Sequence, residues 1–253
     1  MNTTIGRYVY GAAALALGVI GLAFGVFGGV WQPFPDDAPS RHAITYGVAG
    51  LFVLGGGLTL FRRTSAVGAL LCAALYAMFA FFWLTMRLLP HAEEMVFYNG
   101  VAEQLAMAMG GLSILAMRSD ADWSGRLAQG AQLVFGLCLL TFGTAHFVYT
   151  TETADMVPAW LPPDQRTWAL VTGGAHAAAG LALLSGIFAL PASRLLTAMF
   201  VGFGLLVWAP MLAADLSDHI NWAGNAINLA LVGAAWAIGD SIAQRRQGAL
   251  SGS

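Results

Sequence analysis

Residues 66–89 read AVGALLCAALYAMFAFFWLTMRLL, an apolar run in which Arg87 is the one charged residue. A helix needs about 20 mainly apolar residues to cross the hydrocarbon core of a bilayer. Further segments of this kind lie near residues 7–30, 44–62, 100–117, 128–150, 168–189, 193–214 and 222–243. The sequence therefore predicts an all-α, polytopic membrane protein with eight transmembrane helices.

The composition of the chain favours the same class. Of the 253 residues, 58% are apolar and only 9% are charged, and the mean hydropathy is +0.70. A soluble domain usually has about a quarter charged residues. The net charge of −2 argues against a nucleic-acid partner, so the lipid bilayer is the first partner that we expect. Cys72 and Cys138 lie inside apolar runs, which favours helix packing over a disulfide.

The first apolar segment could also be read as a signal peptide. It has no A-x-A-like cleavage site before Trp31, and the repeat described below requires it as a helix. We therefore expect it to be the first span.

The basic residues predict which loops share a side of the membrane. All eleven basic residues are arginines. Eight spans would place both termini on one side of the membrane, together with every arginine except Arg41, Arg87 and Arg166. The positive-inside rule then puts the termini in the cytoplasm. We expect the membrane to be a bacterial inner membrane. The five histidines all fall toward the outer side (His42, His91, His146, His176 and His219). A polar site is therefore expected at the outer, acid-rich face.

The two halves of the chain resemble each other, which indicates an internal repeat. WQPFP at 31–35 answers WLPP at 160–163, GVAGLFVLGGGLTL at 47–60 answers GAHAAAGLALLSGI at 174–187, and YNGVAEQLAMAMGG at 98–111 answers WAGNAINLALVGAA at 222–235. We expect two parallel-repeat, four-helix bundles that pack side by side through Gly and Ala. They would comprise residues 1–120 and 121–245, followed by a short polar tail at 246–253.

This alignment shows where the copies diverge. It pairs Gly50 with Gly180, Gly100 with Gly224 and Gln104 with Asn228. It also pairs His146 with Gly28, His176 with Tyr46, and Glu103 with Ile227. The second half is therefore richer in titratable groups within its helices.

Four stretches of the second half carry a resemblance to a known family. They are FGTAHF at 142–147, MVPAWLPP at 156–163, TGGAHAAAGLALL at 172–184 and NLALVGAAW at 228–236. Together they resemble the DoxX-like membrane proteins over about residues 130–238, and the first half is similar only through the repeat. The resemblance implies a four-helix core with a His-Phe pair at the end of its first helix. The second-helix ionisable position of that family is often Glu, whereas this chain has His176.

His146 and His176 are the first candidates for a binding site. One ends the helix expected over 128–150, and the other lies about two turns inside the next helix. An ionisable group within a membrane usually faces a bundle interior or a wet cavity. Three interpretations are open: structural histidines bonded to neighbouring helices, a site for a quinone or another small lipophilic molecule, and metal ligation.

Further polar residues of the outer face could complete this site. Asp215 and His219, four residues apart, would share a helix face and suit proton relay or metal binding, unless they form a solvated helix end. Asn225 and Asn228, with Glu103 on the fourth helix, would serve as ligands or as interhelical hydrogen bonds.

The proline-rich loop at 156–163 is the last element of the candidate site. Pro158, Pro162 and Pro163 exclude regular helix there. With Trp160 the loop either folds back over the mouth of the bundle, shielding the histidines from water, or serves as an interfacial anchor.

Two functions from different classes fit these residues. Some DoxX-like proteins are subunits of quinone-reducing sulfur oxidoreductases, so the resemblance implies a redox-associated membrane subunit with quinone as its cofactor. A separate redox partner protein is then required, because the chain has no cysteine cluster, haem-attachment motif or dinucleotide fingerprint. The alternative is a non-enzymatic protein that handles a metal or small solute, or stabilises a partner complex. For a metal, His146, His176 and His219 are weak candidate ligands.

Overall fold

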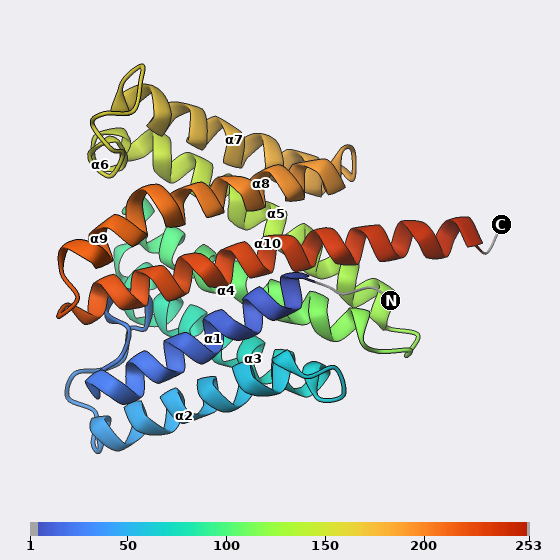
Figure 1. Cartoon of the computed structure of the whole chain (residues 1–253), viewed down its shortest axis with the longest axis horizontal. Helices are drawn as coiled ribbons and strands as arrows, with labels where there is room; N and C mark the ends of the chain where they lie inside the picture. The colour runs from blue at the N-terminus through green and yellow to red at the C-terminus, as the bar shows by residue number, and fades with distance from the viewer. Residues whose placement is uncertain (1–4, 252–253) are drawn as a thin grey trace.

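The computed structural model describes residues 5–251 and shows a bundle of helices that run along a common direction (Figure 1). Helices are the only regular elements among the described residues. Within residues 5–251, eight helical segments are long and apolar enough to cross a membrane. The predicted all-α, polytopic class is confirmed.

Six of the spans are single helices, and two contain a π-helical turn. The single helices are α1 (Ile5–Phe24), α2 (Arg41–Leu60), α4 (Met95–Met117), α5 (Ser124–Val148), α7 (Gln165–Ser185) and α10 (His219–Ser251). The composite spans are α3–η2–η3 (Ser65–Trp83, Leu84–Leu88, Leu89–His91) and α8–η4–α9 (Ala189–Phe203, Gly204–Trp208, Ala209–Ala214). The short elements η1 (Gly29–Trp31) and α6 (Thr150–Asp155) lie in loops. The C-terminal residues expected as a polar tail continue α10 as far as Ser251.

The two halves interlock. In each half the four spans pack in order, and the fourth span then packs on the first span of the other half: α4 on α5, and α10 on α1. The helices α4 and α10 also pack on each other. Within a half, the first and fourth spans barely touch, so each expected four-helix bundle is closed by the other half.

The glycines between the first and second spans make equivalent contacts in both halves. A Cβ placed on Gly56 of α2 would lie 2.7 Å from the Gly11 carbonyl oxygen of α1. A Cβ placed on Gly180 of α7 would lie 2.8 Å from the Gly136 carbonyl oxygen of α5. Packing between membrane helices depends on such small residues, which allow the backbones to approach closely.

These contacts correct the alignment of the repeat in its second helix. The packing pairs Gly56 with Gly180, not Gly50, and therefore pairs His176 with Phe52 rather than with Tyr46. The sequence alignment of α2 with α7 was out of register because both helices consist largely of similar glycine- and alanine-rich turns.

The fourth spans keep the alignment that the sequence predicted. A Cβ on Gly100 of α4 would meet the Trp83 ring at 2.5 Å, and a Cβ on Gly224 of α10 would meet the Trp208 ring at 2.2 Å. The predicted pairing of Gly100 with Gly224 is therefore confirmed by equivalent contacts.

The two ends of the bundle differ in their charged residues. The helix α1 begins, and α10 ends, at the same end of the bundle (Figure 1). The opposite end carries the loops around η1, η3, α6 and α9, with His42, His91, His146 and His219 in these loops or at the helix ends beside them, while His176 lies near the middle of α7. An even number of spans puts both ends of the described chain at the same end of the bundle, as the sequence predicted.

Candidate ligand-binding cavity

A cavity of about 450 Å³ lies in the second half of the molecule, toward the histidine-rich end. Residues of α5, α7, α8, η4 and α10 form its walls, and α4 contributes Asn99 and Glu103. Small-molecule sites usually have volumes of about 300–1,000 Å³ and mainly apolar walls. The cavity is therefore large enough for the headgroup of a lipophilic molecule.

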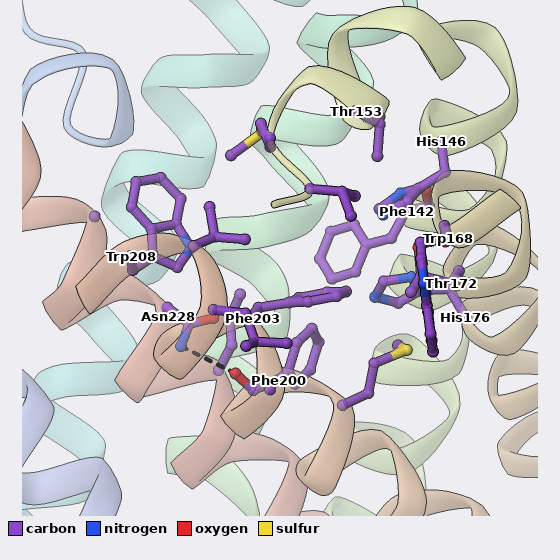
Figure 2. Close-up of a pocket in the computed structure, with 18 of the residues that line it drawn as sticks. Phe142, His146, Thr153, Trp168, Thr172, His176, Phe200, Phe203, Trp208 and Asn228 are labelled. Atoms are coloured by element: carbon purple, nitrogen blue, oxygen red, sulfur yellow. Dashed lines mark hydrogen bonds between the residues drawn. The ribbon is translucent and has the colours of Figure 1, made fainter. Parts of the chain in front are cut away.

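The two predicted histidines both line this cavity, with Trp208 on its other side (Figure 2). The centroids of the His146 and His176 rings lie 4.8 Å apart. His146 is in the last turn of α5, while His176 is near the middle of α7, deeper than predicted because α7 begins at Gln165. His176 is 1% exposed, so its ring belongs to the interior of the protein.

Close packing of α5 on α7 brings the two rings together. A Cβ on Gly143 would lie 2.8 Å from the Gly173 carbonyl oxygen, and a Cβ on Gly173 would lie 2.8 Å from the His146 Cβ. His176 follows Gly173 by three residues, which places it on the same face of α7. The imidazoles therefore meet because Gly173 leaves room for the His146 side chain.

Hydrogen bonds fix the tautomer of both rings. His146 Nδ1 lies 2.9 Å from the Phe142 carbonyl oxygen, and His176 Nδ1 lies 2.9 Å from the Thr172 carbonyl oxygen. A carbonyl oxygen can only accept, so Nδ1 carries the hydrogen in each ring. Within residues 5–251, neither Nε2 atom has a hydrogen-bonding partner.

Aromatic side chains surround the imidazole pair. Phe142, Phe200 and Phe203 have ring centroids 5.7, 5.6 and 6.1 Å from that of His176. The Asn228 side-chain amide donates to the Phe200 carbonyl oxygen at 3.1 Å (Figure 2). The cavity thus combines flat apolar surfaces with a few polar atoms.

The loop of residues 156–164 lines the outer part of the cavity through Met156, Val157, Pro158 and Leu161. Side chains from the first turn of α7 hold it there: Trp168 Nε1 donates to the Pro162 carbonyl oxygen at 2.9 Å, and Gln165 Nε2 donates to that of Val157 at 2.5 Å. This arrangement agrees with the predicted fold-back over the bundle.

Asp164 caps the N-terminus of α7 and completes the anchoring of the loop. Its carboxylate accepts hydrogen bonds from the Thr167 backbone N–H and hydroxyl, both at 2.8 Å. These two bonds, the backbone one first, lower the pKa of the Asp164 carboxyl below its ordinary value.

Four of the eight predicted site residues line the cavity: His146, His176, Asn228 and Glu103. The other four are not part of its lining. Trp160 is 72% exposed, although its neighbours in the loop do line the cavity. Asn225 donates to the carbonyl oxygens of Trp208 at 2.7 Å and Asn221 at 2.8 Å, so interhelical hydrogen bonding explains it.

The predicted pairing of Asp215 with His219 is wrong. The helix α9 ends at Ala214, and the Asp215 carboxylate accepts from the Ser217 hydroxyl at 2.6 Å and backbone N–H at 2.9 Å. These bonds lower the pKa of the Asp215 carboxyl and replace the helical turn that the prediction required. His219 begins a new helix, and its Nδ1 lies 3.7 Å from Asp218.

The equivalent place in the first half is filled. The cavity there has a volume of only about 10 Å³ and is lined by Leu17, Gly21 and Phe52, among others. In the packing register of the two halves, Gly21 occupies the position of His146, and not Gly28 as the sequence alignment had it. Phe52 packs at 6.4 Å from Phe79 in a ring-to-ring stack. The large cavity is thus specific to the second half.

Sequence reasoning missed the wall that α8 and η4 supply. Phe200, Phe203 and Trp208 line the cavity, yet they stand in a uniformly apolar segment. Gly224 was the available signal, because it matches Gly100 and leaves room for Trp208 as Gly100 does for Trp83.

Among the described residues, the imidazole pair is not part of a group of three or more metal-ligating side chains. Zinc sites in proteins have three or four protein ligands. Among residues 5–251, one group of three or more metal-ligating side chains lies close together, and it is the exposed His91, Glu93 and Glu94. The weak metal candidates His146, His176 and His219 do not form such a group.

Residues 135–238 match a family model described as a domain of unknown function (DUF8561). The matched segment contains both histidines and most of the cavity walls. Searches of curated proteins and of solved structures gave no match.

We expect Gly173→Ala to separate α5 from α7 and disturb the imidazole pair, because its Cβ would lie 2.8 Å from the His146 Cβ. Such overpacking costs about 1–3 kcal/mol of the free energy of unfolding. Gly174→Ala is the matched control, since a Cβ there has no atom of the described residues within 4 Å. Thermal unfolding in detergent should show a lower Tm for Gly173→Ala alone, and equal Tm values for the two variants would contradict the packing described.

Proposed function

We propose that this protein binds a small lipophilic molecule with a flat headgroup, a quinone or quinol, in the cavity of its second half. One observation carries the proposal: the cavity holds two imidazoles whose Nε2 atoms have no partner among residues 5–251, while the same place in the first half is filled. A pair of ionisable rings inside a membrane protein is costly to maintain for packing alone.

The walls of the cavity suit a flat ring. The rings of Phe142, Phe200 and Phe203 lie at ring-packing distance from His176, and Trp168 and Trp208 also line the cavity. The quinoid ring needs such apolar contacts, together with hydrogen bonds to its two oxygen atoms. The imidazoles and the Glu103 carboxyl, on different walls, provide polar atoms for that purpose.

The same groups suit the proton exchange that accompanies quinone chemistry. Imidazole and carboxyl groups can take up and release protons near neutral pH when their surroundings favour it. The chain has no cysteine cluster or haem-attachment motif to carry electrons. In this proposal it is therefore a membrane subunit that works with a separate redox partner protein, as the resemblance to DoxX-like proteins implies.

The proposal is tested by exchanging the imidazole pair for the residues of the first half. Wild-type protein purified from membranes should carry co-purifying quinone and be labelled by a quinone photoprobe. The His146→Gly, His176→Phe variant reproduces Gly21 and Phe52 of the first half. It should lose at least about 90% of the label, because both imidazole hydrogen bonds to the ligand are removed and the introduced phenylalanine ring occupies part of the cavity.

His219→Phe is the control for this exchange, because it removes a histidine of the same end that lies outside the cavity. Thermal unfolding establishes that both variants fold. Wild-type protein without quinone or label would contradict the proposal. Stoichiometric zinc or copper by elemental analysis would favour the alternative of a metal-handling protein.

We also propose that the protein lies in a bacterial inner membrane with its termini in the cytoplasm. The concentration of arginines at the end where α1 begins supports this orientation. Both native cysteines are buried, so single cysteines introduced at the exposed Ala92 and Asp122 report on the two ends. In intact spheroplasts, a membrane-impermeant maleimide should label Ala92→Cys and leave Asp122→Cys unlabelled; the reverse pattern would contradict the orientation.

A further inference from the structure

We infer that the cavity recognises hydroxyl groups of its ligand, so that it holds a quinol in preference to the corresponding quinone. The inference rests on the proposed function and specifies which redox form of the ligand the site favours. It is carried by the hydrogen-bonding roles of the two imidazoles and of their polar neighbours.

The first step is the direction of the imidazole hydrogen bonds. The Nδ1 hydrogens of His146 and His176 are donated to carbonyl oxygens of their own helices, both at 2.9 Å. In a neutral imidazole with hydrogen on Nδ1, the Nε2 atom is an acceptor. Each neutral ring therefore offers the cavity a lone pair and has no further hydrogen to donate.

The second step concerns charge. The ring centroids are 4.8 Å apart inside a membrane-spanning bundle, so two imidazolium ions would repel each other where water does not screen them. Within residues 5–251, neither ring is ion-paired with a carboxylate. Glu103 also lines the cavity from α4; its carboxylate can only accept, whereas its protonated form can donate one hydrogen. At least one Nε2 is therefore an acceptor.

The third step concerns the polar hydrogens around the pair. On α7, Trp168 Nε1 donates to the Pro162 carbonyl oxygen at 2.9 Å, and Thr172 Oγ1 donates to that of Trp168 at 2.8 Å. On α10, Asn228 Nδ2 donates to that of Phe200 at 3.1 Å. These three donors each give a hydrogen to a backbone oxygen, while the Nε2 acceptors have no partner among residues 5–251. The Asn99 amide, the Thr153 hydroxyl and the second N–H of Asn228 also line the cavity, and a quinol hydroxyl can accept from such a donor while it donates to Nε2.

The ligand form follows from this balance. The hydroxyl of a quinol donates to an Nε2 lone pair, whereas the carbonyl oxygen of a quinone would face it as a second acceptor. A buried acceptor without a partner lowers affinity, by about tenfold or more in an apolar site. The cavity should therefore bind the quinol at least about tenfold more tightly than the quinone.

The experiment compares three ligands that share a ring and tail: decylubiquinol, decylubiquinone and the dimethyl ether of decylubiquinol. Binding to the full-length protein in detergent is followed anaerobically by quenching of tryptophan fluorescence, since Trp168 and Trp208 line the cavity. We expect the quinol to bind at least about tenfold more tightly than the other two. His219→Phe should keep this preference, and His146→Gly, His176→Phe should abolish it.

The outcomes separate the inference from the proposed function. Equal affinities, or tighter binding of the quinone, would overturn the preference while leaving a quinone-type site in place. Absence of saturable binding by all three ligands would overturn both. Tight binding of the dimethyl ether would show that shape alone selects the ligand, and would also overturn the inference. The comparison in wild-type protein does not depend on the folding of any variant.

Discussion

The contact between α5 and α7 at Gly143 and Gly173 is the constraint on which the candidate site depends. Lipid provides no hydrophobic drive for helix association, so close backbone approach through small residues decides which helix faces meet. Here the approach leaves the His146 Cβ against Gly173. The centroids of the two imidazole rings then lie 4.8 Å apart. Each ring donates its Nδ1 hydrogen to a backbone carbonyl oxygen of its own helix. This single contact therefore brings two Nε2 atoms, with no partner among residues 5–251, to one cavity.

The internal repeat provides a built-in comparison for this site. Both halves pack their first two helices through the same glycine contacts, yet one encloses about 10 Å³ and the other about 450 Å³. Phe52 occupies in the first half the position that His176 occupies in the second. The first half thus shows the same architecture packed as a core.

The sequence was sufficient for the class of fold and for the two histidines, since spanning segments and ionisable residues within them are strong local signals. It was insufficient for Asp215, where an exposed Asp-Ser turn competes with one more turn of helix. It also could not find Phe203 or Trp208, because an apolar residue of a membrane helix faces lipid, a neighbour or a cavity without any change in its type. Only the packing of the helices shows whether such a residue faces lipid, a neighbouring helix or a cavity. The same packing was needed to align the two copies of the repeat.

The most direct test is an experimental structure of the protein extracted in its native lipids. The account predicts non-protein density of a flat group in the cavity, with one of its atoms within hydrogen-bonding distance of Nε2 of His146 or His176. A cavity closed by Phe203 or Trp208, as Phe52 fills the first half, would contradict it.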